Sequence, residues 1–149
     1  MIIKFTVPGF PRGKGRARSF GKQLKSGKII TGQYADEKTV NYEAFIKGQF
    51  VQAYPSFTPI DGPVEMVVEA YFPIPKSASK AKREQMILGY IRPTRKPDLS
   101  NIEKAIEDGL NGVAYMDDSQ VVDRIGHKWY AEFQPRVEVQ IMKIVPFGQ

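Results

Sequence analysis

The sequence contains no cysteine, and this absence alone excludes several kinds of protein. Without a thiol, the chain cannot form a disulfide framework, a zinc finger built on thiolates or a cysteine nucleophile. It also lacks an apolar run approaching the roughly 20 residues that span a bilayer. The N-terminus begins with a strand-like pattern and does not have the layout of a signal peptide. The sequence therefore predicts a cytoplasmic protein with no membrane partner.

Acidic residues are missing from residues 1–35, which carry eight lysines and arginines. Residues 76–96 carry seven more cations against the single acid Glu84. The stretch 98–123 reverses this balance, with seven acids and one cation, Lys104. The net charge of +6 over 149 residues is thus an average of opposite regions. Such a separation suits an enzyme acting on a phosphate polymer, because cations bind the backbone and carboxylates bind a divalent metal. The alternative is that both regions are ordinary solvated faces.

The periodicity of apolar residues predicts a single α+β domain over residues 1–149, with a mixed or antiparallel sheet packed against helices. Alternation with a period of two predicts four strands: residues 2–7, 64–72, 121–130 and 136–145. We expect the last two strands to be antiparallel neighbours. A helical period predicts three helices: residues 37–54, a short basic segment that Ser77 or Ser79 caps and that ends near residue 88, and residues 100–111. Residues 9–33 are predicted to form a basic loop with a short hairpin near residues 28–31.

The predicted helix that follows Pro97 has two distinct side-chain stripes. At about 100° per residue, five apolar side chains fall on one narrow face and form its core side: Leu99, Ile102, Ile106, Leu110 and Val113. Asn101, Lys104 and Asp108 fall together on a second stripe, and Asp98 lies at the helix entrance. This polar group is compact enough to line one site.

Two further acids, Asp117 and Asp118, end the turn after this helix. If the chain returns towards the start of the helix, Asp118 comes near Asp98. Two or three converging carboxylates bind Mg²⁺ through oxygen and leave water and phosphate to complete its coordination shell. A bound Mg²⁺ lowers the pKa of a water and stabilises a leaving oxygen. Lys104 would stabilise the negative charge that develops on the phosphate.

Each of these features also has a purely structural interpretation. The run from Ser100 to Glu103 matches a capping box, so Ser100 can be the N-cap of the helix. Asp98 is then a loop acid that the helix dipole favours. Asp117 and Asp118 can belong to an ordinary turn.

Three ring-bearing residues and one glycine-rich segment favour structural roles over chemistry. His127 is predicted to lie on a strand surface, and Trp129 and Tyr130 to belong to a sheet face or an interface. Residues 12–18 are rich in glycine, lysine and arginine but lack the Gly-Lys-Ser/Thr ending of a P-loop. We therefore expect no nucleotide cofactor.

Two blocks of the sequence form a recognisable pattern. The first runs Lys96-Pro97-Asp98-Leu99-Ser100-Asn101 and continues with Lys104, Asp108, Leu110-Asn111-Gly112 and the run from Asp117 to Val122. The second runs from Pro11 to Arg18 and is followed by Thr39, Tyr42 and Glu43 in the first predicted helix. Together they resemble the RusA family of crossover junction endodeoxyribonucleases, which phages and prophages often encode. The resemblance covers nearly the whole chain, and residues 96–122 are its specific part.

This resemblance implies a small homodimer that resolves Holliday junctions, the four-way branches of DNA, by cutting two strands symmetrically. It implies Mg²⁺ as the cofactor, with Mn²⁺ as a substitute, and one active site per subunit in a bacterial cytoplasm. By the match of motifs, Asp98 and Asp118 are metal ligands, Lys104 is the essential helix lysine, and Asp117 assists.

The chain departs from the family pattern at Ser100, where the family has a second acid. A serine hydroxyl is a far weaker Mg²⁺ ligand than a carboxylate. Ser100 can hold a metal-bound water, Asp108 or Asp117 can compensate, or catalysis can be impaired. We favour compensation, because the neighbouring motif residues are intact. The alternative is a non-catalytic protein that binds branched DNA with the same fold; a metal-dependent nuclease for flaps or single strands is a weaker one.

The cationic segments are predicted to hold the duplex arms of the DNA through phosphate contacts, without reading bases. These contacts are assigned to side chains in two segments: Arg12, Lys14, Arg16, Arg18, Lys76, Lys80, Lys82, Arg83, Arg95, Lys96 and the amide of Asn101.

Overall fold

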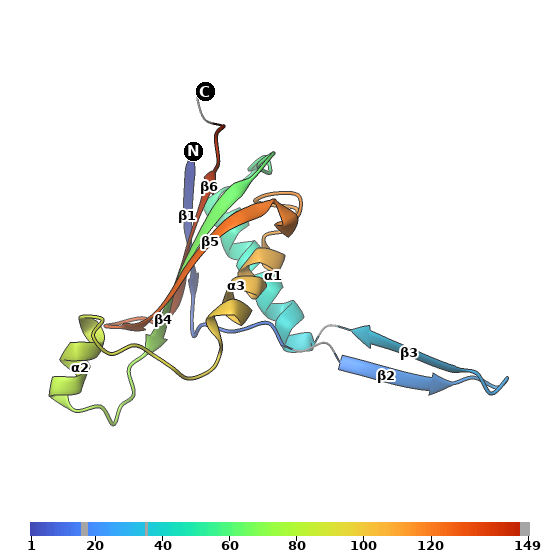
Figure 1. The fold of residues 1–149 in the computed structure, drawn as a ribbon, viewed down its shortest axis with the longest axis horizontal. Helices are drawn as coiled ribbons and strands as arrows, with labels where there is room; N and C mark the ends of the chain where they lie inside the picture. The colour runs from blue at the N-terminus through green and yellow to red at the C-terminus, as the bar shows by residue number, and fades with distance from the viewer. Residues whose placement is uncertain (16–17, 35, 147–149) are drawn as a thin grey trace.

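The computed structural model describes residues 1–15, 18–34 and 36–146. Within these residues the chain forms a four-stranded mixed sheet, three α-helices and a separate two-stranded sheet (Figure 1). The predicted α+β class is confirmed. The larger sheet has the order β1 (Ile2–Pro8), β6 (Arg136–Lys143), β4 (Val64–Pro73) and β5 (Val121–Ala131). The helices are α1 (Glu37–Ala53), α2 (Lys80–Ile87) and α3 (Leu99–Gly109).

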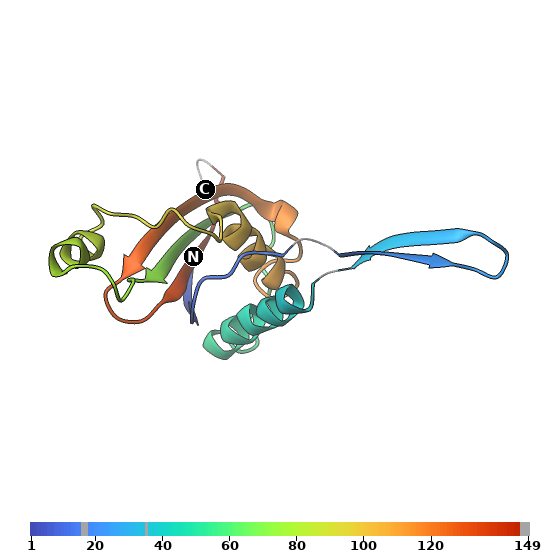
Figure 2. The same cartoon turned by 90° about the horizontal axis from the view of Figure 1, so that it is seen from below.

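One face of the four-stranded sheet is apolar and packs against two helices. In β1, β4 and β6 a buried residue alternates with a more exposed one, because successive side chains of a strand point to opposite faces. Helices α1 and α3 lie side by side against the apolar face (Figures 1 and 2). The core between them includes Ile3, Phe5, Val7, Ile46, Phe50, Val64, Met66, Val68, Ile102, Ile106, Val139 and Ile141. Removing this surface from water is the main driving force for the fold.

The two C-terminal strands are not neighbours, so the pairing predicted for residues 121–130 and 136–145 is wrong. Strand β4 lies between them, parallel to β5 and antiparallel to β6. Glu69 of β4, for example, is opposite His127 on one side and Glu138 on the other. The alternation of side chains identifies the face that a residue occupies, but it carries no information about which strand lies beside it.

Helix α2 lies at one end of the molecule, away from α1 and α3 (Figure 1). Ser79, one of the two predicted caps, is its N-cap, and its Oγ accepts a hydrogen bond from the backbone N–H of Lys82 at 3.3 Å. A Cβ atom at Gly89, just after the helix, would lie 3.1 Å from the ring of Trp129. Trp129 is thus part of the packing between the α2 region and β5, as a sheet-face residue. None of the helices in the described part of the chain is long and apolar enough to cross a membrane.

Strands β2 (Arg18–Gln23) and β3 (Ile29–Tyr34) form an antiparallel hairpin that projects from the body of the molecule (Figure 2). The hairpin predicted near residues 28–31 is therefore much longer than expected. At its tip, Leu24 N–H donates to the carbonyl of Lys28 at 2.8 Å, and Gly27 N–H donates to the carbonyl of Leu24 at 2.9 Å. Gly27 has a φ of 88°, a conformation that glycine adopts without steric cost.

Candidate active site

Helix α3 starts at the motif that the sequence identified as chemically important. Its N-cap is Asp98, with φ −66° and ψ 146°. Ser100 lies in the first turn and is exposed, so the structural alternative with Ser100 as the N-cap is wrong. The side chains of Ile102 and Ile106 are fully buried, as the predicted core stripe requires. The polar stripe is thereby turned away from the core, towards α1 and the turn that precedes β5.

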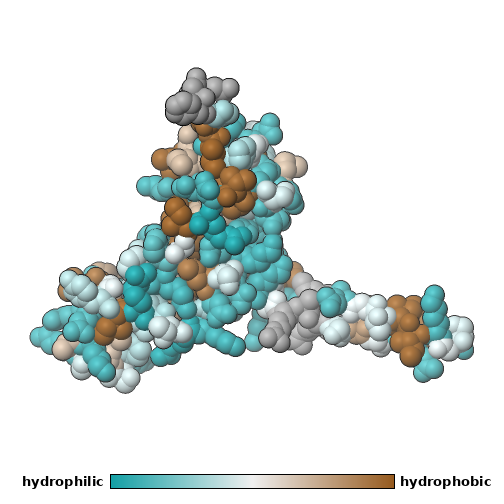
Figure 3. All heavy atoms as spheres, in the orientation of Figure 1, coloured by the Kyte–Doolittle hydropathy of each residue, from teal (hydrophilic) through white to brown (hydrophobic). Residues whose placement is uncertain are grey.

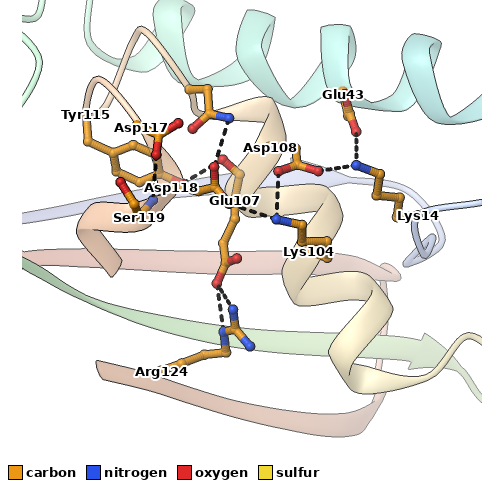
Figure 4. A network of polar contacts seen from close by, with 11 residues as sticks. Lys14, Glu43, Lys104, Glu107, Asp108, Tyr115, Asp117, Asp118, Ser119 and Arg124 are labelled. Carbon is orange, nitrogen blue, oxygen red and sulfur yellow. Dashed lines mark hydrogen bonds and ion pairs between the residues drawn. The ribbon is translucent and has the colours of Figure 1, made fainter. Parts of the chain in front are cut away.

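On this polar side, Lys104 lies between two carboxylates (Figure 4). Its Nζ is 2.7 Å from Oδ2 of Asp118 and 3.2 Å from Oδ1 of Asp108. Asp108 is one turn further along α3, at the i, i+4 spacing at which side chains meet. Three of the site residues predicted from the sequence, Lys104, Asp108 and Asp118, therefore lie together in the structure.

The turn before β5 positions Asp118. Asp117 is the N-cap of a single 3-10 turn, Asp118–Gln120, and its Oδ2 accepts a hydrogen bond from the N–H of Ser119 at 3.1 Å. The side-chain amide of Gln120 forms hydrogen bonds through both of its polar atoms. Its Oε1 accepts from the backbone N–H of Asp117 at 3.1 Å, and its Nε2 donates to the carbonyl of Ile60 at 2.8 Å. Gln120 therefore anchors the turn to the loop before β4. With the turn anchored, the side chain of Asp118 reaches Lys104.

Lys14, predicted to contact DNA, has its amino group among the same acids (Figure 4). Its Nζ forms an ion pair with Asp108 and lies 4.0 Å from Oε1 of Glu43 on α1. We call Glu43, Asp108 and Asp118, with Lys14 and Lys104, the acid cluster. Glu43 had been identified only as part of the family pattern, because a single acid on a helix has no chemical signature in a sequence.

Two glycines allow the segment around Lys14 to approach the helices closely. Lys14 N–H donates to the carbonyl of Asn101 at 3.0 Å. A Cβ atom at Gly13 would lie 2.9 Å from Cβ of Asn101, and one at Gly15 would lie 2.7 Å from Oγ1 of Thr39. A larger residue at either position would push the segment away from α3 or α1. Gly13 and Gly15 therefore serve a close backbone contact with α3 and α1.

The lysines and acids of the acid cluster shift one another's pKa. The hydrogen bond from Lys104 is the largest cause that lowers the pKa of Asp118 below its usual value. The same bond is the largest cause that raises the pKa of Lys104. Burial raises the pKa of Glu43, and Lys14 opposes this shift. Asp118 and Lys104 are therefore both charged throughout the neutral pH range.

A second polar contact connects α3 with β5 behind the acid cluster. Nε of Arg124 is 2.7 Å from Oε1 of Glu107 and 3.7 Å from Oε2 of Glu103. Both glutamates are buried, and burial raises the pKa of each, while Arg124 lowers it. From the sequence, Glu103 was considered only as the acid of a capping box, and Glu107 and Arg124 were given no role. The signal in the sequence was the position of Glu103 and Glu107, four residues apart and next to the core residues Ile102 and Ile106. Two acids on the inward side of a helix need a cation as a partner.

A groove of about 530 Å³ lies beside the N-terminal end of α3. Asp98 lines it together with Arg12, Lys14, Lys96 and Asn101. The structure therefore places one predicted metal ligand in the same groove as four predicted DNA contacts. Lys14 connects the groove with the acid cluster, since it lines the groove and its Nζ contacts Asp108.

The remaining predicted DNA contacts lie elsewhere. Those on and before α2 are exposed at the far end of the molecule from the hairpin, and Arg95 is exposed in the connection between α2 and α3 (Figure 1): Lys76, Lys80, Lys82, Arg83 and Arg95. Arg18 begins β2, and Arg16 lies outside the described residues. His127, predicted as a strand-surface residue, lies on β5 with its Nδ1 3.2 Å from Oε1 of Glu69.

Asp98 and Asp118 are placed at different levels of α3. Asp118 contacts Lys104, which lies six residues beyond Asp98, or about 9 Å along the helix axis. Among the described residues, no group of three or more His, Cys, Asp or Glu side chains is arranged to hold a metal ion. The expectation that the turn after the helix returns Asp118 to the helix entrance was therefore too simple, because the turn returns it to the middle of α3.

The donor atoms of the acid cluster nevertheless fit a hard divalent cation. Asp108 and Asp118 offer carboxylate oxygens, which are the ligands that Mg²⁺ prefers. The Nδ2 of Asn111 donates to Asp118 at 3.3 Å, while its Oδ1 is buried without a hydrogen-bond partner in the described part of the chain. A buried oxygen without a partner is costly, and a cation or its water would satisfy it.

Comparison with known proteins agrees with the motifs that line this site. The sequence model of the family described as Endodeoxyribonuclease RusA matches residues 8–142. The chain belongs to the RusA endodeoxyribonuclease family. It is also similar to a protein of Bacillus subtilis (strain 168) named Uncharacterized protein YqaN, with 43% identity over 145 residues, which cover 95% of this chain and 96% of that protein. Membership of the RusA family implies an endonuclease that acts on Holliday junctions.

Proposed function

We propose that this protein is a Mg²⁺-dependent endodeoxyribonuclease that resolves Holliday junctions by cutting two strands symmetrically. Lys104, held between Asp108 and Asp118 beside a cationic groove, is the single observation that carries this proposal. Carboxylates suit a divalent metal, and a neighbouring ammonium group suits a phosphodiester whose charge increases during cleavage. The family match supports the same activity.

Asp108 is the acid that best replaces the carboxylate missing at Ser100. It shares Lys104 with Asp118, so the two carboxylates lie on either side of one ammonium group. Asp117 is less suitable, because its side chain caps the turn that positions Asp118. We therefore assign metal binding to the pair Asp108 and Asp118, retain Asp98 from the family motif although it lies at a different level of α3, and assign a positioning role to Asp117. A water held by Ser100 is the alternative.

The residues of the site have separate tasks in this proposal. Bound Mg²⁺, or Mn²⁺ in its place, would supply a water of lowered pKa and stabilise the leaving oxygen. Lys104 keeps its proton at neutral pH, since Asp118 raises its pKa, and can stabilise charge on the scissile phosphate. Arg12 and Lys96 line the groove and would hold the phosphate backbone beside Asp98.

A homodimer completes the proposal. Two copies related by a two-fold axis would present two equivalent sites to the two strands that a symmetric resolution cuts. We propose the cytoplasm of a bacterium as the compartment, and a phage or prophage as the source of the gene.

The decisive experiment uses conservative substitutions of the two motif acids. We expect Asp98→Asn and Asp118→Asn to abolish cleavage of a synthetic four-way junction in Mg²⁺, while each variant still binds the junction in EDTA. Each change removes a negative ligand but keeps the size of the side chain. Asp123→Asn is the matched control, because Asp123 is an exposed acid of the same stretch, on β5. Cleavage at the wild-type rate by either variant would show that the site assignment is wrong.

The same assay separates the proposal from its rival, a non-catalytic protein that binds branched DNA. The rival predicts binding of the junction with no nicks in Mg²⁺ or Mn²⁺. Equal cutting of linear, flap and four-way substrates would instead indicate a nuclease with a different specificity.

A further inference from the structure

The β2–β3 hairpin, which we call the arm, combines positive charge with exposed apolar side chains. Residues 18–34 contain four lysines and arginines and no acid. Phe20, Ile29 and Ile30 are nevertheless 47%, 66% and 42% exposed. Figure 3 shows an apolar patch near the far end of the arm, with hydrophilic residues beyond it. Exposed apolar groups concentrated on a projecting element mark an interaction surface rather than a solvated one.

The register of the hairpin arranges these side chains on its two faces. Lys22 is opposite Ile30, and Phe20 is opposite Gly32, so Phe20, Lys22 and Ile30 share one face. Ile29 lies on the other face. A Cβ atom at Gly32 would lie 2.7 Å from the ring of Phe20, so the ring lies against the backbone of the opposite strand. The aromatic ring is thereby held in place before any partner binds, which lowers the entropic cost of binding.

The charge of the arm selects the class of partner. Lys22, Lys25 and Lys28 would repel an identical arm, so a partner must be anionic. Asp108 and Asp118 are poor candidates for binding the arm of a second copy, because both are already paired with lysines. Nucleic acid supplies the required phosphate charge.

Apolar side chains beside these cations need an apolar surface on the DNA. In a linear duplex the faces of the bases are stacked and hidden, whereas a branch point exposes them. Aromatic side chains stack on exposed bases whatever their sequence, because every base has a π-face. A cationic ribbon with Phe20, Ile29 and Ile30 on its surface therefore matches a branch point better than a regular duplex.

We propose that the arm contacts unstacked bases at the branch point of the DNA. The lysines of the arm bind phosphates of the adjoining duplexes, and Phe20, Ile29 and Ile30 lie against base faces. This contact makes the protein prefer branched DNA over linear DNA. The inference rests on the proposed function, since it takes branched DNA as the substrate, and it identifies the element that selects it.

The test compares binding of a four-way junction with binding of a linear duplex of the same sequence, by fluorescence anisotropy in EDTA. The apolar variant is the triple substitution Phe20→Thr, Ile29→Thr and Ile30→Thr, since the β-branched threonine suits a strand. Its control is Ile2→Thr, a 57% exposed isoleucine on β1. The charge variant is the triple substitution Lys22→Glu, Lys25→Glu and Lys28→Glu, with Lys143→Glu on β6 as its control. Circular dichroism checks that each variant is folded.

We expect the apolar variant to lose about tenfold in junction affinity and less than twofold in duplex affinity. A 2-aminopurine placed at the branch point should report base contact with the wild type and Ile2→Thr, but not with the apolar variant. The charge variant should weaken binding to both DNAs and reduce the slope of log affinity against log salt by about 3.

Three results would overturn the inference. One is an apolar variant that keeps the junction preference and the 2-aminopurine signal. Another is equal binding of both DNAs by the wild type, which is expected if the arm simply enters a duplex groove. The third is a change of oligomeric state in the apolar variant, measured by sedimentation without DNA. Cleavage in Mg²⁺ is scored separately, so a wild type that cuts nothing would disprove the nuclease and leave the binding comparison intact.

Discussion

At the scale of single residues, Lys14 controls the charge balance of the acid cluster. Its amino group contacts Asp108 and approaches Glu43, while Lys104 bridges Asp108 and Asp118. Two ammonium groups thus offset two of the three carboxylate charges, and the acid cluster keeps a net charge of −1. If Asp108 is a metal ligand, as we propose, Lys14 must release it before the metal can bind. Because Lys14 lines the groove, DNA bound there would be close enough to draw this side chain away.

We therefore predict that Lys14→Met lowers the Mg²⁺ concentration needed for half-maximal junction cleavage. The expected change is about two- to fivefold, the factor that corresponds to a partly exposed ion pair of 0.5–1 kcal/mol. A titration of cleavage against Mg²⁺ measures it, and Mn²⁺ binding followed by electron paramagnetic resonance measures the same effect without DNA. Lys38→Met, in the same groove, is the control. An unchanged metal requirement would show that Lys14 does not compete at Asp108.

At the scale of elements, α3 is the helix that connects the core with the site. One side of it buries Ile102 and Ile106, another carries Lys104 and Asp108, and the side that faces β5 carries Glu103 and Glu107. The last two acids would be costly to bury without a partner. The guanidinium of Arg124 on β5 supplies one, and so determines how α3 rests on the sheet.

Arg124→Met should destabilise the protein by about 3 kcal/mol, because it leaves two buried carboxylates without their cation. The free energy of unfolding in urea measures this loss. Arg136→Met is the matched control: Arg136 pairs with the exposed Glu138 and lies 4.0 Å from the ring of Tyr71, so we expect a loss of only about 1 kcal/mol. Equal losses in the two variants would contradict a special role for Arg124.

The same variant should show a diagnostic dependence on pH. Burial raises the pKa of Glu103 and Glu107 above the usual 4.5, so the folded state binds their protons more tightly than the unfolded state. Their contribution to the free energy of unfolding therefore falls as the pH rises from below 4.5 through the raised pKa values. Arg124 opposes this rise, so its removal should cost more at neutral pH than near pH 5.

At the scale of the whole molecule, cations lie at both ends of the longest dimension, with α3 between them. The arm projects at one end, and α2, with exposed basic residues, lies at the other (Figure 1). The groove and the acid cluster lie on α3 and its neighbours. One chain can therefore contact DNA on both sides of a single cleavage site, whereas a symmetric resolution needs two such sites.

We predict that the protein sediments at about 34 kDa, twice the 16.8 kDa of one chain. Paired incisions should convert a plasmid with an extruded cruciform into linear DNA rather than a nicked circle. Mixed dimers of the wild type with Asp118→Asn should give nicked circles instead, because they contain one intact site. Linear product from a species that sediments as a monomer would contradict the dimer.

Much of the fold was predictable because it depends on local periodicity. The strands at 2–7, 64–72 and 136–145 and the helix at 37–54 appear close to their predicted bounds. The pairing of β5 with β4 was not predictable, since an alternating strand buries the same face whichever strand lies beside it. The length of the arm was also missed, because a basic sequence with few apolar residues has no face to bury and so gives no periodic signal.

Some features of the candidate site were likewise predictable from the sequence, and others were not. The residue types and their spacing were readable from the sequence: carboxylates at Asp98, Asp108 and Asp118, with Lys104 one helical turn before Asp108, since helix geometry places residues four apart on one face. The packing of the turn before β5 against α3 decided that Asp118 meets Lys104 rather than Asp98. The tertiary structure also decided that Lys14 enters the acid cluster, since such contacts depend on how distant segments pack together, which local periodicity does not encode.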